Sequence, residues 1–420
     1  MANDNLLPVE EALAKILDLI KVLPGEKVSL LHALGRVLVE PVAAEDDLPP
    51  FANSAMDGFA VIAEDVAEAS DNNPVTLAVI GDIPAGSAQL LTLRPATAAR
   101  IMTGAPLPQK ADAIVPVEFT DEPWRQPDRP LPSVISIYKP VRSGDHIRWP
   151  GEDVRKGAKI LPAGHRIRPQ EIGVLASLGV VEATVIQRPR VAILSTGDEL
   201  IPIEEPLTPG KIRNSNSFTL RAQLKSLGAD VVDLGTAKDT YSDVKARLAE
   251  GLSQNVNLFI STAGVSVGAY DVVKEVLEAG GAVSFWRVNM RPGKPLAFGT
   301  YGGVPYLGLP GNPVSAMVSF ERFARPAILK MSGHVKVERS RITAVIQSEI
   351  FSDGRESYLR ASVRKEDGRY IAELNGRQGS HVMTSLIEAN GLLIVPAGVT
   401  RLAAGAKAEV MMLDWPESVF

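Results

Sequence analysis

The sequence contains no cysteine, few aromatic residues and no long apolar run. The absence of cysteine from 420 residues excludes disulfides, thiolate metal ligands and cysteine nucleophiles, so any metal ion would need oxygen or imidazole ligands. No apolar run reaches membrane-spanning length, and the first residues lack a basic stretch followed by an apolar core. We therefore expect a cytoplasmic protein with no membrane contact.

Strong charge is also lacking. The formal net charge of -5 argues against general nucleic-acid binding, although local basic loops could still bind a small anion. Apolar residues make up 45% and charged residues 22%, close to the average of globular proteins, which argues against disorder and fibrous structure. With about 150 residues per domain, a chain of 420 residues predicts roughly three domains.

The first part of the chain predicts a mixed region interrupted by a β-rich insertion. Residues 8–21 have the apolar spacing of an amphipathic helix, with proline and two glutamates at its start. Short β-like runs separated by Gly and Pro clusters follow, and residues 169–178 predict a second helix. We assign residues 1–50 and 168–187 to the mixed region and residues 51–167 to the insertion.

Residues 188–332 alternate between strand and helix patterns. The strand candidates are residues 191–194, 231–234, 258–260 and 283–286, and the helix candidates are residues 217–227, 242–252, 272–279 and 313–330. Such alternation predicts parallel strands joined by right-handed crossovers. In the last helix, Pro326 predicts a kink, and Asn312 is a possible cap. Residues 333–420 return to β-like patterns, so we expect a separate C-terminal β domain.

Four loops follow strands of the α/β segment, at residues 195–199, 261–271, 291–295 and 308–315. Each loop alone could be an ordinary turn or helix cap. Together they place Gly-rich backbone, hydroxyls, two basic side chains and three acids at one edge of a sheet. That edge could hold a phosphorylated ligand and a hard cation.

The loop after residues 258–260 has two interpretations. Gly264 and Gly268 allow a sharp turn and close approach to a ligand, and Ser266 adds a hydroxyl. Asp271 could cap the following helix or face a ligand, and this segment alone favours neither.

Six motifs in order resemble the MoeA family, the molybdopterin molybdenumtransferases, which are related to the E domain of gephyrin. They are Asn-Ser-Ala-Met-Asp-Gly at 53–58, Arg-Ile-Met-Thr-Gly-Ala at 100–105, Gly-Glu-Asp at 151–153, Ser-Thr-Gly-Asp-Glu at 195–199, Gly-Val-Ser-Val-Gly at 264–268 and Gly-Leu-Pro-Gly-Asn-Pro at 308–313. The resemblance covers nearly the entire chain.

The resemblance implies insertion of molybdenum from molybdate into adenylylated molybdopterin, with release of AMP and with Mg²⁺ as the metal ion. It implies molybdate or ligand contacts by Ser266, Arg291, Lys294, Pro295, Ser315, Arg360 and Ser380. Further substrate contacts are implied for Ser195, Thr196, Gly197, Asp198, Gly264, Gly268, Pro292, Gly293, Pro310, Gly311, Asn312 and Pro313. Glu199 and Asp271 are the implied metal ligands, with Asp239 a weaker third.

The resemblance also implies a homodimer in which Asp57 and Thr103 reach the partner's site, and contacts with other proteins of molybdenum cofactor biosynthesis. Lys294, Glu199, Asp271, Asp57 and Thr103 are the implied catalytic residues. Two alternatives remain, a gephyrin-like scaffold and an adenylyltransferase of the preceding step. The sequence favours neither, because it has no linker or amphipathic tail for the first and has additional domains for the second.

The sequence departs from the family pattern at four places. They are Ala263 in place of glycine, Trp149-Pro150 in place of basic residues, Asn214 in place of aspartate and Arg291 in place of lysine. Position 214 therefore has no carboxylate, and Arg291 keeps its charge with a different geometry.

Overall fold

The computed structural model describes residues 6–88, 91–122, 130–262 and 270–415. The chain divides into two compact units. One consists of Ser29–Leu31 and Glu40–Glu182, and the other contains the remaining described residues, including everything from Ala183 onward. The second unit holds an α/β segment and a β-barrel.

The first unit is built on the five-stranded sheet β7-β4-β6-β5-β8. Its strands are β4 (Gly58–Val61), β5 (Val75–Ile83), β6 (Thr97–Ile101), β7 (Ala113–Pro116) and β8 (Val134–Ile137). Two buried apolar clusters, around Phe59 and around Ile83, flank the sheet. The expected helix at 169–178 is α2 (Pro169–Ser177).

Short strands and 3₁₀ turns complete this part of the chain. The strands are β1 (Gly25–Ser29), β2 (Val42–Ala43), β3 (Asn53–Ser54), β9 (Ile147–Arg148), β10 (Lys159–Leu161) and β11 (Glu182–Ile186). The 3₁₀ turns are η1 (Leu30–Ala33), η2 (Ala63–Val66) and η3 (Val117–Phe119). The short strands form the two-stranded sheets β1-β11, β2-β10 and β3-β9.

The α/β segment contains the six-stranded sheet β15-β12-β16-β20-β19-β17. Its strands are β12 (Arg190–Thr196), β15 (Asp230–Ala237), β16 (Leu258–Thr262), β17 (Gly281–Arg287), β19 (Pro295–Tyr301) and β20 (Val304–Leu309). The four strands β15, β12, β16 and β20 are parallel, as expected. Every residue of β16 is buried, because both faces of this central strand are covered.

The sheet is not entirely parallel, because it contains one reversed strand, β19, that was not among the strand candidates. Residues 283–286 lie in β17, which runs in the same direction as β12, β16 and β20, as expected. Strand β19 is antiparallel to both β17 and β20. The connections from β17 to β19 and from β19 to β20 are too short for a crossover helix, so the chain reverses direction. The pattern of strand and helix residues did not separate this hairpin from the parallel strands.

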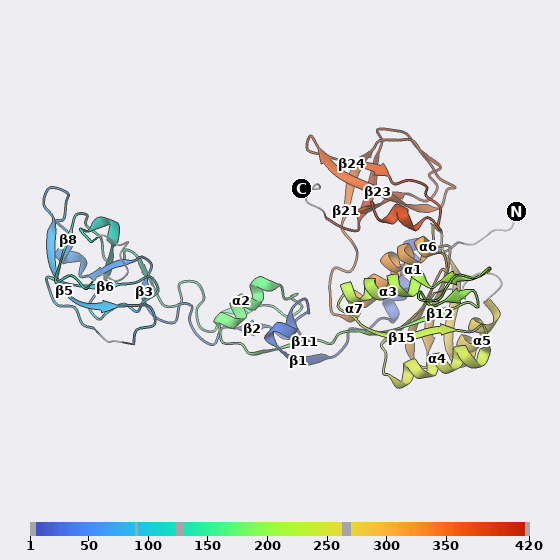
Figure 1. Cartoon of the computed structure of the whole chain (residues 1–420), viewed down its shortest axis with the longest axis horizontal. Coiled ribbons are helices and arrows are strands. Elements are labelled where there is room, and N and C mark those ends of the chain that lie inside the picture. The colour runs from blue at the N-terminus through green and yellow to red at the C-terminus, as the bar shows by residue number, and fades with distance from the viewer. Residues whose placement is uncertain (1–5, 89–90, 123–129, 263–269, 416–420) are drawn as a thin grey trace. The chain divides into compact units, whose positions relative to one another are not determined.

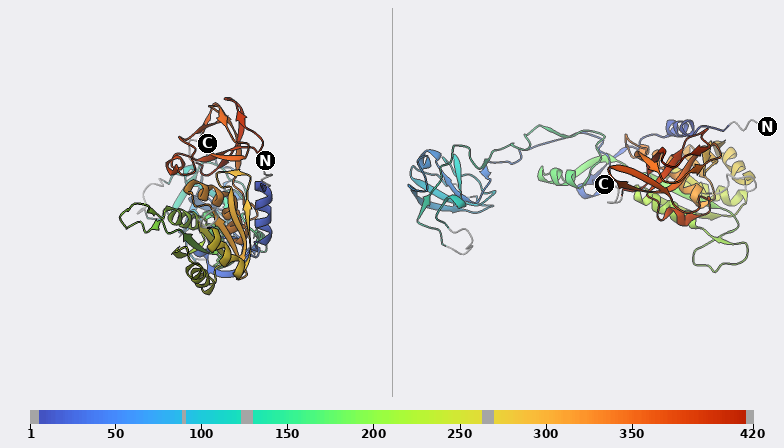
Figure 2. Two further views of the ribbon diagram at one scale, coloured as in Figure 1. Left: turned by 90° about the vertical axis from the view of Figure 1, so that its right-hand side faces the viewer. Right: turned by 90° about the horizontal axis from the view of Figure 1, so that it is seen from above.

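Helices cover both faces of the sheet (Figure 1). One face carries α4 (Tyr241–Ser253) and α5 (Tyr270–Gly280). The other packs against α1 (Val9–Leu19), α3 (Ser215–Ser226), α6 (Pro313–Ser319) and α7 (Arg325–Met331). Helix α1 lies along the α/β segment although it is distant in sequence (Figure 2). Its buried stripe, Val9, Ala12, Leu13 and Ile16, matches the predicted amphipathic face.

The last helix is interrupted next to Pro326, as expected. A π-helical turn, η4 (Phe320–Ala324), separates α6 from α7, and Pro326 lies in the first turn of α7. Proline fits there because the first N–H groups of a helix need no partner within it. Asn312 occupies the N-cap position of α6, as expected, although its side chain makes no capping hydrogen bond.

The C-terminal strands close into a barrel, drawn in orange and red in Figures 1 and 2. They are β21 (Arg341–Ile346), β23 (Glu356–Glu366), β24 (Arg369–Leu374), β25 (Gly391–Val395) and β27 (Lys407–Met412). Pairing of β23 with both β24 and β25 completes the closure. The remaining elements are β13 (Leu200–Ile201), β14 (Ile212–Arg213), β18 (Met290–Arg291), β22 (Ile350–Phe351), β26 (Arg401–Leu402) and the 3₁₀ turn η5 (Met383–Leu386).

Candidate active site

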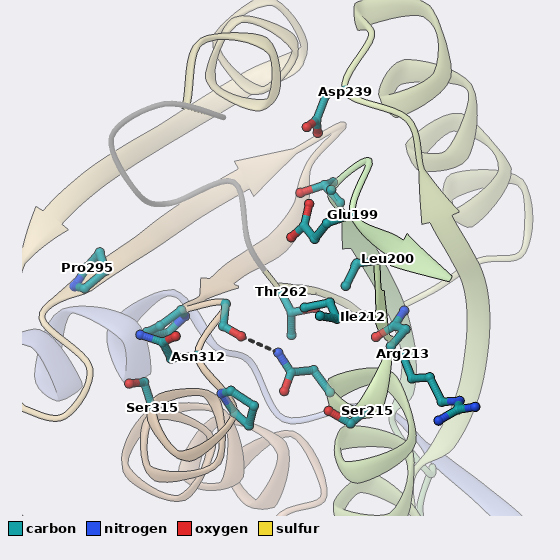
Figure 3. Close-up of a pocket in the computed structure, with 17 residues that line it drawn as sticks. Glu199, Leu200, Ile212, Arg213, Ser215, Asp239, Thr262, Pro295, Asn312 and Ser315 are labelled. Atoms are coloured by element: carbon teal, nitrogen blue, oxygen red, sulfur yellow. Dashed lines mark hydrogen bonds between the residues drawn. The ribbon is translucent and has the colours of Figure 1, made fainter. Parts of the chain in front are cut away.

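A cavity of about 370 Å³ opens at the carboxyl ends of the parallel strands β12, β16 and β20 (Figure 3). This is the edge at which open α/β sheets bind ligands. We call it the sheet-edge cavity. Its lining residues are Thr196, Gly197, Glu199, Leu200, Ile212, Arg213, Asn214, Ser215, Asn216, Asp239, Thr262, Pro295, Pro310, Gly311, Asn312, Pro313 and Ser315.

Carboxylates gather at one end of the sheet-edge cavity. Glu199 and Asp239 lie there, away from Asn312 and Ser315 (Figure 3). Burial, together with the negative charges of Asp198 and Glu199, raises the pKa of Asp239. Its Oδ1 atom is buried without a hydrogen-bond partner in the described part of the chain. This end therefore has an excess of negative charge that a cation would neutralise.

Gly197 makes room for the Glu199 carboxylate. A β-carbon at position 197 would lie 2.5 Å from a Glu199 carboxylate oxygen, and the φ of +138° at Gly197 is unfavourable for other residues. Any other residue at position 197 would displace the Glu199 carboxylate and would have to adopt an unfavourable φ.

Helix α3 begins at the opposite wall of the cavity. Asn214 caps it by accepting a hydrogen bond from the Ser217 N–H. Asn216 donates a 2.7 Å hydrogen bond to the Gly311 carbonyl oxygen, which ties this helix to the loop before α6. An asparagine at position 214 serves as a cap as well as an aspartate would, which accounts for this departure from the family pattern.

Buried hydroxyls lie beneath the cavity, at the ends of two strands. Ser195 and Thr262 share a hydrogen bond of 3.2 Å, and the Tyr306 hydroxyl donates to Ser261 at 2.6 Å. Burial raises the pKa of Tyr306 to about 12, so its hydroxyl stays protonated and remains a donor. Thr196 lines the cavity, and its hydroxyl has no partner among the described residues.

A second cavity of about 430 Å³ adjoins the first and shares Pro295, Asn312 and Ser315 with it. We call it the cationic cavity, because basic side chains dominate its walls. Its lining residues are Arg291, Pro292, Gly293, Lys294, Pro295, Asn312, Ser315, Arg355, Gln378, Gly379, Ser380 and His381. An anion in this cavity would meet several hydrogen-bond donors and little opposing charge.

One carboxylate moderates the charge of the cationic cavity. Arg355 donates two hydrogen bonds to the Oδ2 of Asp353, at 3.1 and 2.5 Å, and Arg291 lies 3.5 Å from that same oxygen. Hydrogen bonding by Arg355 is the main cause that lowers the pKa of Asp353. Asp353 therefore keeps its charge at neutral pH and holds two arginines at the cavity.

The barrel contributes the loop from Gln378 to His381 to the cationic cavity, and we call it the barrel loop. Arg360 lies behind this loop and is fully buried. Its Nη2 donates to the carbonyls of Arg377 and Gly379, and its Nε donates to Ser385. Burial and repulsion by Arg291 lower the pKa of Arg360 to about 10, which leaves it charged at neutral pH. Its Nη1 has no partner within the described ranges.

The barrel loop is bonded directly to the α/β segment. The Val314 N–H, in the first turn of α6, donates a 3.1 Å hydrogen bond to the Ser380 carbonyl oxygen. Both Ser380 and Ser315 line the cationic cavity. The barrel thus supplies groups to a site whose other residues come from the sheet.

Asp57 and Thr103 belong to the other unit and form a pair there. The Oδ1 of Asp57 accepts hydrogen bonds from the N–H of Thr103 at 2.7 Å and from its hydroxyl at 2.8 Å. Neither residue lines the sheet-edge cavity or the cationic cavity. The pair therefore belongs to a different compact unit from the cavity residues.

Several predicted residues lie away from the cavity walls. Ser195 is buried beneath the sheet-edge cavity, and the Asp198 side chain accepts a hydrogen bond from the Asp239 N–H. Asp271 lies in the first turn of α5, which begins at Tyr270, so the expected cap position before the helix is wrong. Ala263, Gly264, Ser266 and Gly268 lie outside the described residues.

Sequence analysis missed the cavity residues Arg355, Asn216, Gln378 and Arg213. Arg355 lies four residues after the end of β22, in Ser-Asp-Gly-Arg, a pattern typical of an ordinary turn. Asn216 was visible as part of Asn-Ser-Asn at a helix start, where a cap is the ordinary interpretation.

Clusters of metal-ligating side chains and membrane-spanning helices are both absent from the described residues. No group of three or more histidine, cysteine, aspartate or glutamate side chains is arranged for a metal ion in the described ranges. In the same ranges, no helix is long and apolar enough to cross a membrane.

Family models match three successive parts of the chain. Residues 7–179 match the "MoeA N-terminal region (domain I and II)", residues 192–330 a "Probable molybdopterin binding domain" and residues 343–413 the "MoeA C-terminal region (domain IV)". These matches lie in one order along most of the sequence, as the motifs do.

Proteins named molybdopterin molybdenumtransferase are similar over nearly their full length. A Mycobacterium tuberculosis protein is 43% identical over 91% of this chain and 94% of its own length. One from Bacillus subtilis is 35% identical over 98% of this chain and 97% of its own.

Two crystal structures of the molybdopterin biosynthesis protein MoeA from Pyrococcus horikoshii share the fold. Their TM-scores are 0.80 and 0.78, with 31% and 30% identity over 98% and 97% of this chain and 100% of each. Fold and sequence agree on one class of protein. The chain belongs to the MoeA family.

Proposed function

We propose that this protein transfers molybdenum from molybdate to adenylylated molybdopterin, releasing AMP and forming molybdenum cofactor. The observation that supports this best is the pair of adjoining cavities that share Pro295, Asn312 and Ser315. The reaction needs one site for a large phosphorylated ligand and another for a small oxyanion beside it. The relatives' printed name, molybdopterin molybdenumtransferase, is consistent with this chemistry.

The cationic cavity is the proposed oxyanion site. Molybdate is a tetrahedral dianion, so it suits the charges of Arg291 and Lys294 and the hydroxyls of Ser315 and Ser380. Arg360 contributes positive charge from behind the loop. Binding there would hold molybdate next to the ligand in the neighbouring cavity, so the encounter becomes effectively intramolecular.

The sheet-edge cavity is the proposed site for the pterin nucleotide. Phosphate oxygens suit backbone N–H groups at a helix start, and α3 begins at its wall with Ser215. The loop Pro310–Pro313 forms the opposite wall and is held by Asn216. Leu200 and Ile212 add apolar area against which a flat ring could pack.

Magnesium is part of this proposal, with Glu199 and Asp239 as ligands and Asp271 as a third by family position. Mg²⁺ prefers carboxylate oxygens and retains water molecules, and the unpartnered, buried Oδ1 of Asp239 fits a cation. When bound, the ion would neutralise charge as the phosphoanhydride bond breaks. Calorimetric titration with Mg²⁺ should show binding that Glu199→Gln weakens, whereas equal binding by the variant would refute the assignment.

We further propose a homodimer in which Asp57 and Thr103 reach the partner's site. Their mutual hydrogen bonds fix the half-buried Asp57 carboxylate in place, as a contact group requires. Light scattering should report twice the chain mass. A monomer that is still fully active would rule out the shared site.

The proposed reaction is tested by following AMP release from adenylylated molybdopterin with and without molybdate. We expect release to depend on molybdate and to be accompanied by formation of molybdenum cofactor. Release at the same rate without molybdate, or no release with it, would contradict the proposal.

A further inference from the structure

Helix α6 begins at both cavities and continues through the π turn η4 into α7. The π turn carries charged residues that are buried. After α6, the turn η4 carries Glu321 and Arg322, of which 9% and 1% are exposed. A π turn adds a residue to the helix and redirects side chains, and such turns occur frequently at functional sites. A buried arginine is costly unless it is paired, so its partners show what the turn connects.

Arg322 belongs to a closed ring of four alternating charges. Its guanidinium contacts Glu10 at 2.9 Å and Glu338 at 3.0 Å. Arg341 contacts the same two carboxylates at 3.2 and 3.4 Å. The ring thus joins helix α1, the π turn and the segment that enters the barrel.

The segment between α7 and β21 is bound to the π turn and the start of α7 at three successive residues. Arg325 donates to the Val337 carbonyl at 2.8 Å, Arg322 bonds to Glu338, and Arg339 donates to Glu321 at 2.6 Å. The π turn η4 and the start of α7 therefore fix the path along which the chain enters the barrel.

A second connection runs from Arg322 to the site through one barrel strand. The Arg322 guanidinium lies 5.8 Å from the centre of the Tyr358 ring, within the range of a cation–π contact. Tyr358 and Arg360 are two residues apart on β23 and both fully buried, so they face the same side of the strand. Arg360 holds the carbonyls of Arg377 and Gly379, next to Ser380.

We propose that Arg322 is a positioning residue for the oxyanion site. The π turn and its charge ring hold the barrel in a fixed position relative to the helical stretch from α6 to α7. They thereby determine where the loop around Ser380 lies relative to Lys294 and Ser315. The bond from Val314 to Ser380 fixes the other end of the same helix to the same loop. The inference rests on the proposed use of the cationic cavity for molybdate, but it makes a separate prediction about Arg322.

The test compares molybdate and AMP binding in the full-length protein by calorimetry. Arg322→Met removes the charge but keeps the aliphatic length, and its two carboxylate partners are 57% and 44% exposed and keep Arg341. We expect the Kd for molybdate to rise about tenfold, a coupling of typical size, while the Kd for AMP changes by less than about twofold.

Two further variants keep the test independent of folding. Arg341→Met breaks the same ring at its more exposed arginine and should leave both dissociation constants within about twofold, because Arg322 keeps its partners. Arg322→Lys keeps the charge without the forked geometry and should restore part of the molybdate affinity.

The outcomes separate the two proposals. A weaker Kd for molybdate alone, partly restored by lysine, supports a positioning role. Equal loss of both affinities, or no change in molybdate affinity, overturns it. If the unaltered protein binds AMP but not molybdate, the proposed oxyanion site is wrong, independently of Arg322.

Discussion

The two cavities differ in the parts of the chain that build them. Among the described residues, those that line the sheet-edge cavity all come from the α/β segment, between Thr196 and Ser315. The cationic cavity needs the barrel as well, through Arg355 and the loop from Gln378 to His381. A single sheet edge therefore suffices for the proposed nucleotide site, whereas the oxyanion site exists only when two folded parts are fixed together. Substitutions should separate the two sites accordingly.

The largest difference between the effects on the two cavities is expected from Lys294→Ala. It removes a basic group from the cationic cavity, so molybdate-dependent AMP release should fall about 10²–10³-fold, as when one preorganised donor is lost. AMP affinity, measured by calorimetry, should stay nearly unchanged. Lys407→Ala, on an exposed part of β27, is the control and should behave like the unaltered protein. Unchanged molybdate affinity in the Lys294 variant would refute its role.

The next largest effect is expected at Gly293, where the loop of the cationic cavity packs on α6. A β-carbon there would lie 2.6 Å from the Ser319 hydroxyl oxygen, at a φ of +110°. Gly293→Ala should therefore destabilise the protein by about 1–3 kcal/mol and weaken molybdate binding. Thermal unfolding measures the first effect and calorimetry the second.

Adding Ser319→Ala to the Gly293 variant removes one of the clashing atoms. Partial recovery of the midpoint of unfolding is expected, because the unfavourable φ remains. No recovery would mean that backbone strain, rather than the contact with α6, sets the loop.

Asn216→Ala is expected to have a smaller effect, and to weaken AMP binding more than molybdate binding. Loss of its hydrogen bond to Gly311 releases one wall of the sheet-edge cavity, so the Kd for AMP should rise by up to about tenfold. Molybdate affinity should change less. Ser226→Ala, at the far end of α3, removes a hydroxyl from the same helix without touching the cavity and provides the control. Equal effects of both substitutions would show that helix stability alone matters.

The smallest expected change is a gain. Asp353→Asn removes the negative charge that faces Arg291 and Arg355, so molybdate should bind about twofold to fivefold more tightly, as fits a partly exposed ion pair. Because Arg355 lowers the pKa of Asp353, the charge removed is a full one at neutral pH. The gain should shrink in high salt. Weaker binding would mean that Asp353 is needed to hold the arginines in place.

Much of the fold followed from local patterns in the sequence. The apolar spacing of α1 and the strand run that became β16 follow from side-chain periodicity, which needs no distant contacts. The hairpin of β19 and β20 and the π turn did not follow, because strand direction and helix register depend on neighbours distant in sequence.

The candidate site likewise has features that follow from local sequence patterns and features that depend on distant contacts. Sequence alone determined that glycines, hydroxyls, acids and the loop of Lys294 follow strands of one sheet, because residues at strand ends are adjacent in the chain to a recognisable pattern. Only the tertiary structure decided that Arg355 and Ser380 of the barrel complete the cationic cavity. The two parts are distant in the sequence, and a bond that joins them, from the Val314 N–H to the Ser380 carbonyl oxygen, forms only when both have folded.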